Sequence, residues 1–329
     1  MKKLKSIPFI LAILALLLAS CGGASTATPA AENAPTAATA AELEGNITIS
    51  GAWALYPMMT RWAEEFQKVH PKVTFDVSAG GAGKGMADAL AGAVDIGMVS
   101  RGITPEEEAK GAYWVPVTKD AVFVTISDQN PVLQDLLKVG ITQETFIKIY
   151  ITGEIKTWGE VIGKPEITDE IHVYTRSDAC GAAETWAKYL GKAQEDLLGT
   201  GVFGDPGLLD AVIKDPLGIG YNNLNYAYDM TSGKPVAGAM VAPIDANANG
   251  VVDPDEQLVT KDNAVQAVAT GKYPSPPARA ENLVTNGKPS GLAQAFILWI
   301  LADGQQYCGE AGYVQLTKEQ LEESLKKVR

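Results

Sequence analysis

The stretch from Ser78 to Arg101 constrains the fold most, because its pattern predicts a strand, a glycine-rich turn, an amphipathic helix and a second strand. Glycines at positions 80, 81, 83 and 85 let the backbone approach a ligand, and the helix offers unpaired N–H groups at the positive end of its dipole. Ser100 and Arg101 follow the second strand, at the edge where open α/β sheets bind ligands. The pattern therefore predicts a βαβ unit with an anion site at Gly83, Lys84, Ser100 and Arg101, although a tight turn without a ligand has the same pattern.

This turn departs from the two common nucleotide-binding loops. A P-loop has Ser or Thr after its lysine to hold magnesium, whereas Lys84 precedes Gly85 and Met86. A dinucleotide fingerprint has a third glycine where this chain has Met86. We therefore expect a simple oxyanion in this turn.

The first 20 residues have the pattern of a bacterial lipoprotein signal peptide. Three lysines precede an apolar run from Ile7 to Leu18, which is shorter than the roughly 20 residues that span a membrane. The run ends in LASC, which resembles the lipobox, so Cys21 is the expected lipid anchor; an ordinary secretory signal is the alternative. Residues 21–44 are rich in Ala, Thr and Pro and predict a flexible tether. We expect an extracytoplasmic protein, in the periplasm or at the outer face of the cytoplasmic membrane, held there by lipid alone.

Composition argues against several other classes of protein. The formal net charge of −12 makes nucleic acid an unexpected partner, and the isolated His70 and His172 disfavour a zinc site. No catalytic triad or nucleophile elbow is evident, so we expect no enzyme. The apolar run Phe296–Ala302 is too short to span a membrane and predicts a buried helix. Cys180 and Cys308 could form a disulfide or remain two buried thiols.

A second strand, turn and helix open the predicted folded body. Residues 46–50 alternate as a strand, and the turn that follows leads into a helix near Pro57, a residue suited to a first helical turn. The backbone amides of this turn, at Ala54 and Leu55, are expected to face the ligand.

A third such segment supplies a second arginine. The strand that ends at Arg176 leads through a polar turn into a helix that begins near Gly181. The free amides at Cys180, Gly181 and Ala182, together with Arg176, are expected to grip the anion from the opposite lobe. A surface ion pair is the alternative role for Arg176.

Five segments in this order resemble the phosphate-binding lipoproteins of bacterial ABC importers: GAWALYP, AGGAGKGMADALAGAVDIGMVSR, YWVPVTKDAVFVTISDQNPV, YTRSDACGAAETWAKYLG and GIGYNNLNYAY. The resemblance spans most of the chain after the leader. It implies an α/β, two-lobed type II periplasmic-binding-protein fold with two hinge-crossing strands. It also implies a monomer that binds phosphate without chemistry of its own and delivers it to an ABC permease.

The chain departs from that family at several ligand positions. Where the family places hydroxyl groups, this chain has Ala52 or Trp53, Ala82, Cys180 and Ala182. Ser100 stands where the family often has an acidic residue that accepts the proton of hydrogen phosphate. Sulfate, molybdate, tungstate or a phosphonate therefore remain alternative ligands, and a sensor or adhesion lipoprotein remains an alternative function.

The order of segments predicts how the lobes divide the chain. Lobe one is expected to contain residues 45–115 and 218–329, and lobe two residues 116–217. Strands at Val115–Lys119 and Gly218–Asn222 are expected to cross between the lobes and to form the hinge.

Residues 245–256 match the twelve-position calcium loop. Oxygen ligands recur at the required spacing, and Gly250 occupies the position of the sharp turn. The expected calcium ligands are Asp245, Asn247, Asn249, Val251 through its carbonyl, Asp253 and Glu256. An acidic hairpin without metal is the alternative. Two asparagines lower the negative charge, so we expect a structural calcium site of modest affinity.

Overall fold

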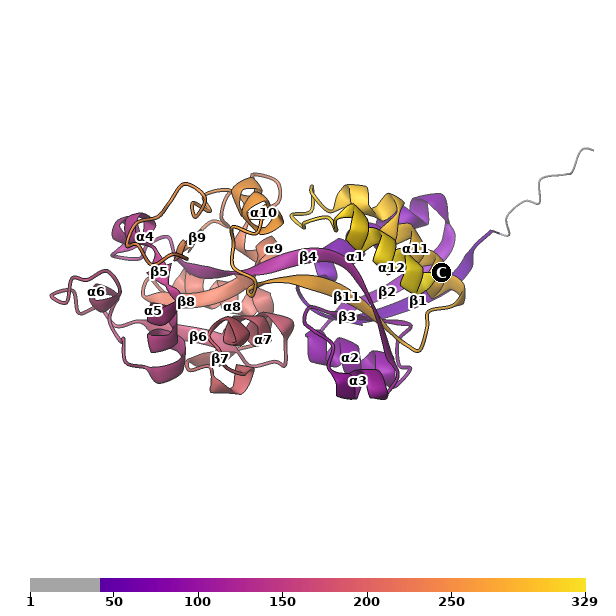
Figure 1. Ribbon diagram of the computed structural model, residues 1–329, viewed down its shortest axis with the longest axis horizontal. Coiled ribbons are helices and arrows are strands. Elements are labelled where there is room, and N and C mark those ends of the chain that lie inside the picture. Colours follow the sequence, from indigo (N-terminus) through magenta and orange to yellow (C-terminus); the bar gives the residue numbers. More distant parts are fainter. Residues whose placement is uncertain (1–41) are drawn as a thin grey trace, which may run out of the picture. The chain divides into compact units, whose positions relative to one another are not determined.

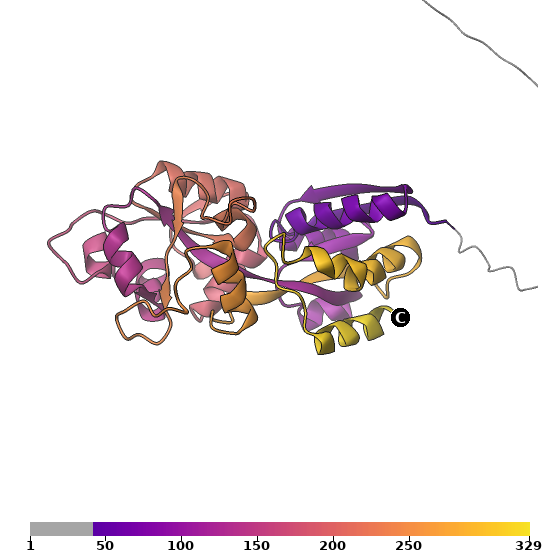
Figure 2. The same ribbon diagram turned by 90° about the horizontal axis from the view of Figure 1, so that it is seen from above.

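The computed structural model describes residues 42–329, which form one compact unit around two hydrophobic cores. The predicted signal peptide, the expected lipid anchor Cys21 and nearly all of the predicted tether lie outside the described residues. We call the part built from residues 42–117 and 283–329 lobe one, and the part built from residues 121–273 lobe two. Figures 1 and 2 show the two lobes, with β4 (Ala112–Ser127) and β11 (Ala278–Asn286) running from one to the other.

A single nine-stranded sheet extends through both lobes. In lobe one, β1 (Glu44–Gly51) is parallel to β2 (Lys72–Ala79) on one side and to β3 (Ile96–Val99) on the other. β11 is antiparallel to both β3 and β4 and so joins the two halves of the sheet. In lobe two the order continues from β4 through β8 (Gly218–Asn223), β6 (His172–Arg176) and β7 (Thr200–Val202), while β9 (Ala239–Val241) also pairs with β4.

Helices cover the sheet of lobe one: α1 (Tyr56–Val69), α2 (Ala82–Leu90), α3 (Pro105–Ala109), α11 (Gly291–Leu301), the 3₁₀ helix η3 (Asp303–Tyr307) and α12 (Lys318–Val328). α1 has Pro57 in its first turn, where the missing N–H is not needed, and buries Trp62 and Phe66. Burial of each such side chain stabilises the fold by about 1.5–3 kcal/mol. The predicted apolar helix is α11, which buries Phe296 and Ile300. Within residues 42–329 no helix has the length and apolar character that crossing a membrane requires.

Lobe two carries shorter helices: α4 (Leu133–Val139), α5 (Gln143–Ile147), the π-helix η1 (Lys148–Thr152), α6 (Trp158–Val161), α7 (Gly181–Tyr189), η2 (Gln194–Asp196), α8 (Gly204–Lys214), α9 (Leu224–Ala227) and α10 (Lys261–Ala269). Its core is rich in aromatic side chains. The ring of Trp186 lies 5.6 Å from that of Tyr150 and 5.9 Å from that of Tyr221. These contacts fix α7 against the sheet.

The predicted division between the lobes is wrong for residues 218–273. These residues were expected in lobe one, but β10 (Ile244–Asp245) pairs with β5 (Ile141–Thr142), and Tyr273 is buried in the core of lobe two. The hydroxyl of Tyr273 donates a hydrogen bond to the carbonyl oxygen of Val122 at 2.7 Å. The calcium-like loop 245–256 therefore belongs to lobe two.

The predicted hinge is half confirmed. β4 contains Val115–Lys119 and crosses between the lobes as expected. The second predicted strand, Gly218–Asn222, lies in β8 and pairs with residues 122–126 of β4 inside lobe two. The second crossing strand is β11, and a bridge between Lys119 and Val314 adds a further link.

Candidate functional site

The βαβ unit predicted from Ser78 to Arg101 is confirmed as β2, α2 and β3. Gly85 packs α2 closely on the sheet, since a Cβ there would lie 2.5 Å from the carbonyl oxygen of Met98. Gly81 and Gly83 instead face lobe two, where Cβ atoms would lie 2.7 and 3.1 Å from the carbonyl oxygen and the Cβ of Ala179. Gly81 has φ +94°, a conformation that glycine adopts without strain. The glycines thus serve both helix packing and contact between the lobes.

The N-terminus of α2 lies against the turn before α7. The N–H of Gly83 donates to the carbonyl oxygen of Ala179 at 3.3 Å, a hydrogen bond between the lobes. Gly181, the first residue of α7, lies against Ser100 so closely that a Cβ would be 2.2 Å from its Oγ. The predicted residues Gly83, Ser100 and Gly181 therefore come together where two helix N-termini approach each other, an arrangement suited to an anion.

Lys84 was predicted beside the anion, and in the structure its ammonium group pairs with Asp88 one turn further along α2. Asp88 also accepts a hydrogen bond from the hydroxyl of Ser50 at 2.6 Å. The hydrogen bonds from Lys84 and Ser50 lower the pKa of Asp88. Lys84 is thus part of an ion pair that holds α2 to β1.

The first turn, from Gly51 to Pro57, is already hydrogen-bonded within lobe one. The N–H of Leu55 donates to the carbonyl oxygen of Ala52 at 3.2 Å, so the predicted amide of Leu55 has a partner in its own turn. The carbonyl oxygen of Ala54 accepts from the hydroxyl of Tyr313. Trp53 reaches across to lobe two, where its ring meets Phe203 edge to face with centroids 6.1 Å apart.

Arg176 is fully buried and holds two carboxylates. Its Nε and Nη2 donate to Asp178 at 2.8 and 2.6 Å, and its Nη1 donates to Asp205 at 2.6 Å. Burial disfavours the charged form, but Asp205 and Asp178 outweigh burial and raise the pKa of Arg176. The surface ion pair considered for Arg176 is excluded, and the guanidinium is fixed at the end of β6 beside the α7 turn.

Arg101 is held by carboxylates from both lobes. Nη1 and Nη2 donate to Glu107 at 2.9 and 2.6 Å, and Nε lies 3.1 Å from Glu184 on α7. The hydrogen bonds that Arg101 donates to Glu107 raise the pKa of Arg101. Its predicted role as an anion ligand is thus accompanied by a structural one, because Arg101 links α3 of lobe one to α7 of lobe two.

The start of α7 is capped by a thiol. Cys180 occupies the N-cap, and its Sγ accepts from the N–H of Ala183 at 3.4 Å. Burial raises the pKa of Cys180 to about 12, so the thiol stays protonated. Cys180 and Cys308 are both free and lie in different cores, which excludes the disulfide that the sequence left open. Ala182, also predicted at the site, is buried directly after Gly181.

Sequence reasoning missed the carboxylates that organise both arginines. Asp178 stands two residues after Arg176 and could have been suspected from that spacing, since Arg176 ends the strand and Asp178 directly follows it in the turn. Asp205 and Glu184 lie on α8 and α7, and nothing local to either arginine points to them.

A cavity of about 400 Å³ opens between the lobes beside these turns. Lobe one contributes Gly83, Arg101 and Thr104, and lobe two contributes Ala179, Glu184 and Lys192.

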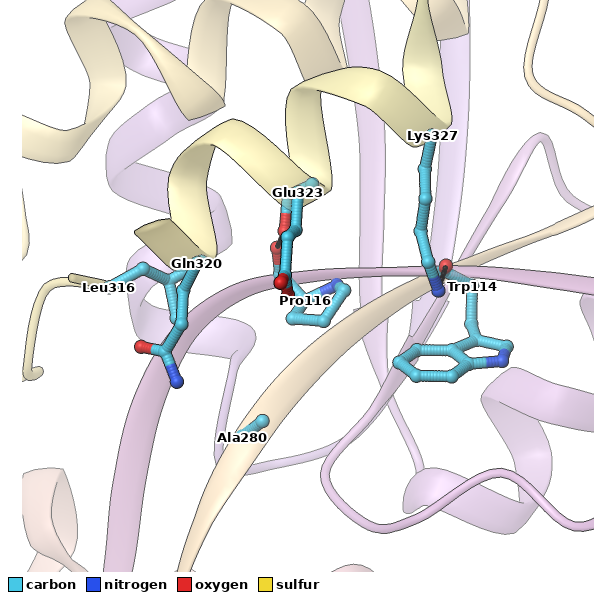
Figure 3. Close-up of a pocket in the computed structure, with 8 residues that line it drawn as sticks. Trp114, Pro116, Ala280, Leu316, Gln320, Glu323 and Lys327 are labelled. Carbon is cyan, nitrogen blue, oxygen red and sulfur yellow. Dashed lines mark hydrogen bonds between the residues drawn. The ribbon is translucent and has the colours of Figure 1, made fainter. Parts of the chain in front are cut away.

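A second cavity, of about 180 Å³, lies between α12 and the two hinge strands (Figure 3). There the ammonium of Lys327 lies 3.3 Å from the ring centre of Trp114. None of the three predicted turns lines this second cavity.

The calcium-like loop satisfies its oxygens internally. Asp245 accepts from the N–H groups of Asn249 and Gly250, at 3.1 and 2.8 Å, and Glu256 accepts from Ala246 and Asp253. Over residues 42–329 the structure gathers no three His, Cys, Asp or Glu side chains into a metal-binding group. Calcium at this loop therefore stays a prediction.

Comparisons with known proteins agree with this geometry. Residues 29–304 match the family described as the PBP superfamily domain. The chain is 28% identical over 320 residues to "Phosphate-binding protein PstS" of Bacillus subtilis (strain 168), which covers 96% of each chain. It is 24% identical to the protein of the same name from Pseudomonas aeruginosa (strain PAO1), over 97% of this chain and 98% of that one.

Solved structures agree on the fold. The crystal structure of a "putative phosphate ABC transporter substrate-binding protein with bound phosphate" from Clostridium perfringens superposes with a TM-score of 0.68 at 23% identity, covering 83% of this chain and all of that one. An "ABC-type phosphate transport receptor" from Vibrio cholerae gives a TM-score of 0.60 at 19% identity, with 82% and 100% coverage. The type II periplasmic-binding-protein fold predicted from the sequence is confirmed, and the chain belongs to the family of the PBP superfamily domain.

Proposed function

We propose that this protein captures phosphate outside the cytoplasm and delivers it to an ABC importer, without chemistry of its own. The observation that carries the proposal is the meeting of the α2 and α7 N-termini across the lobes, beside the buried guanidinium of Arg176. The relatives named phosphate-binding protein PstS align over nearly the whole chain, which supports phosphate as the ligand.

Backbone amides are the main donors that such a site offers. Ala82 and Ala182 provide no hydroxyl at the two helix starts, so Ser100 and the first-turn N–H groups other than those of Gly83 and Ala183 would contact the oxyanion. These amides donate hydrogen bonds without carrying a formal charge, and they point along the helix dipoles, which favours a tetrahedral anion. Withdrawal of the anion from water strengthens each of these hydrogen bonds.

The missing hydroxyls also support a second candidate, a binding protein for sulfate, molybdate, tungstate or a phosphonate. Ser100 cannot accept a proton from the ligand as a carboxylate would, so the turn itself does not reject a fully ionised anion. A sensor or adhesion lipoprotein on the same fold would bind an oxyanion without an importer.

Calorimetry with ligand-stripped protein tests the proposal, with phosphate, sulfate, molybdate and tungstate titrated in parallel. We expect phosphate to bind with micromolar or lower Kd, and Arg176→Ala to lose that binding. Arg61→Ala is the matched control, because Arg61 is partly exposed and pairs with Glu65 on α1, away from the turns. Binding of another oxyanion in place of phosphate would support the second candidate, and binding of none would contradict both.

We propose further that Cys21 carries the lipid that holds the protein at the membrane. The LASC sequence and the apolar run before it support this anchor. Replacement of Cys21 by serine should release the protein from membranes, as measured by detergent phase partition, and should remove the lipid mass from its N-terminal peptide.

A further inference from the structure

A buried charge cluster lies on the hinge strands. Asp120 on β4 and Glu281 on β11 are both fully shielded from solvent, and Arg279 of β11 lies between them. Nη2 of Arg279 is 3.5 Å from Asp120, and its Nε is 3.2 Å from Glu281. Two carboxylates thus share one guanidinium in a site without water access.

The carboxylates of this cluster lack well-formed hydrogen bonds. Among residues 42–329, no donor with hydrogen-bond geometry reaches the carboxylate oxygens of Asp120 or Glu281, and Nε and Nη1 of Arg279 likewise lack an acceptor. A buried, unpaired carboxylate is strongly disfavoured in its charged form and tends to hold a proton instead. Burial raises the pKa of Asp120 and of Glu281. Repulsion from Asp205 raises the pKa of Asp120 further, and repulsion from Asp120 raises that of Glu281, whereas Arg279 lowers both.

Hydrogen bonds connect this cluster to Arg176. Nη2 of Arg279 donates to Oδ1 of Asn223, whose Nδ2 donates to Oδ2 of Asp205 at 2.8 Å. The same oxygen of Asp205 accepts from Nη1 of Arg176. With Asp178, the network holds four carboxyl groups and two guanidinium groups, so it is net negative when all are ionised.

Other polar groups lie around the carboxyl pair on neighbouring elements. Asp205 lies near it on α8, and Tyr226, Tyr273 and Tyr313 lie near Asp120 on α9, the segment before β11 and the segment after η3. Their hydroxyls donate to the backbone carbonyl oxygens of Trp53, Val122 and Ala54. Burial raises the pKa of all three tyrosines, so they stay neutral. The backbone N–H groups of Ala121 and Leu224 also face Asp120.

We propose that the carboxyl pair Asp120–Glu281 takes up a proton from solvent when an oxyanion binds beside Arg176, and returns it when the anion leaves. The inference rests on the proposed function. A bound anion adds negative charge to a dry network that is already net negative, and a proton on the pair offsets that charge. Phosphate should therefore bind more tightly as pH falls, beyond the effect of the titration of phosphate itself.

Calorimetry in two buffers of different ionisation enthalpy measures the number of protons taken up per inorganic phosphate bound, at several pH values from 6 to 8.5. Glu281→Gln and Asp120→Asn keep the shape of each side chain and remove its titration. Asp210→Asn is the matched control, since Asp210 lies on the same helix as Asp205 but is exposed and pairs with Lys214. Because the titration of phosphate is common to all variants, differences between variants report the protein alone.

We expect wild type and Asp210→Asn to take up more protons than Glu281→Gln, by up to about one per phosphate, with Asp120→Asn also reduced. Phosphate binding with equal proton numbers in all four proteins would overturn the inference and leave the proposed function standing. Failure of wild type to bind phosphate or the other oxyanions would instead overturn the proposed function, and this inference with it. If thermal melts show that neither hinge variant folds, the number of protons that wild type takes up per phosphate decides. The inference is overturned if that number is no greater than the titration of phosphate alone requires.

Discussion

Replacement of Gly181 by alanine should weaken ligand binding without weakening the fold. An alanine Cβ would lie 2.2 Å from both the carbonyl oxygen and the Oγ of Ser100, whereas ordinary contacts begin near 3.4 Å. The lobes would have to separate here by about 1.2 Å to relieve the overlap. The hydrogen bond between Gly83 and Ala179, 3.3 Å long, would then be lost.

The expected magnitude follows from these two effects. Overpacking costs about 1–3 kcal/mol and the lost hydrogen bond about 1 kcal/mol, so the closed form should be destabilised by about 2–4 kcal/mol. If the anion binds to the closed form, Kd should rise by about 30- to 900-fold. The free protein relieves the overlap by opening, and alanine in a helix is favoured over glycine by about 0.5–1 kcal/mol, so its melting temperature should not fall.

Calorimetry with phosphate and small-angle scattering of the free and bound protein would measure the effect. Gly309→Ala is the matched control, because a Cβ there would meet nothing within 4 Å. Gly83→Ala, with contacts of 3.1 and 3.3 Å, should give an intermediate rise in Kd. A wild-type Kd for Gly181→Ala would refute the reasoning, since the contact between Gly181 and Ser100 would then play no part in binding.

Three further predictions concern charge and metal. Arg176→Ala should lower the free energy of unfolding by about 3–5 kcal/mol, as measured by urea, because Asp178 and Asp205 lose their buried partner; unchanged stability would contradict this role. Burial raises the pKa of Glu281 in the folded protein above its value in the unfolded chain. The contribution of Glu281 to stability is therefore fully present below the pKa of the unfolded chain, and it is lost as pH rises through the pKa of the folded protein. Unfolding free energy should therefore fall as pH rises across the neutral range, by about 1.4 kcal/mol per unit of pKa difference, and Glu281→Gln should flatten this dependence. Millimolar calcium should raise the melting temperature, because it binds the folded loop, and Asp245→Ala should remove the increase; equal melts in calcium and chelator would rule out the site.

The sequence predicts local features of this fold well and long-range ones poorly. The unit from Ser78 to Arg101 was predicted correctly, because alternation and glycines are local signals. The hinge was half wrong, since only the pairing of β11 with β4, more than 150 residues earlier, reveals the second crossing strand. The partners of Arg101 could not be inferred in full either, because Glu184 approaches it from the other lobe. Contacts between segments that are far apart in the sequence leave no signal in the spacing of residues or in the composition.

The two cores differ in how the chain supplies them, and this sets an order of assembly as the chain is made. Apart from Val314, the buried core of lobe two comes from one stretch, residues 121–273, whereas lobe one combines the start of the described chain with its last 47 residues. α12 completes lobe one: the hydroxyl of Ser324 donates to the carbonyl oxygen of Pro116 at 2.9 Å, and the side-chain amide of Gln294 donates to the carbonyl oxygen of Val328. As the chain grows from its N-terminal end, nearly all of lobe two can close first, while the βαβ unit with its glycine turn stays without its full core until the final helix has been made.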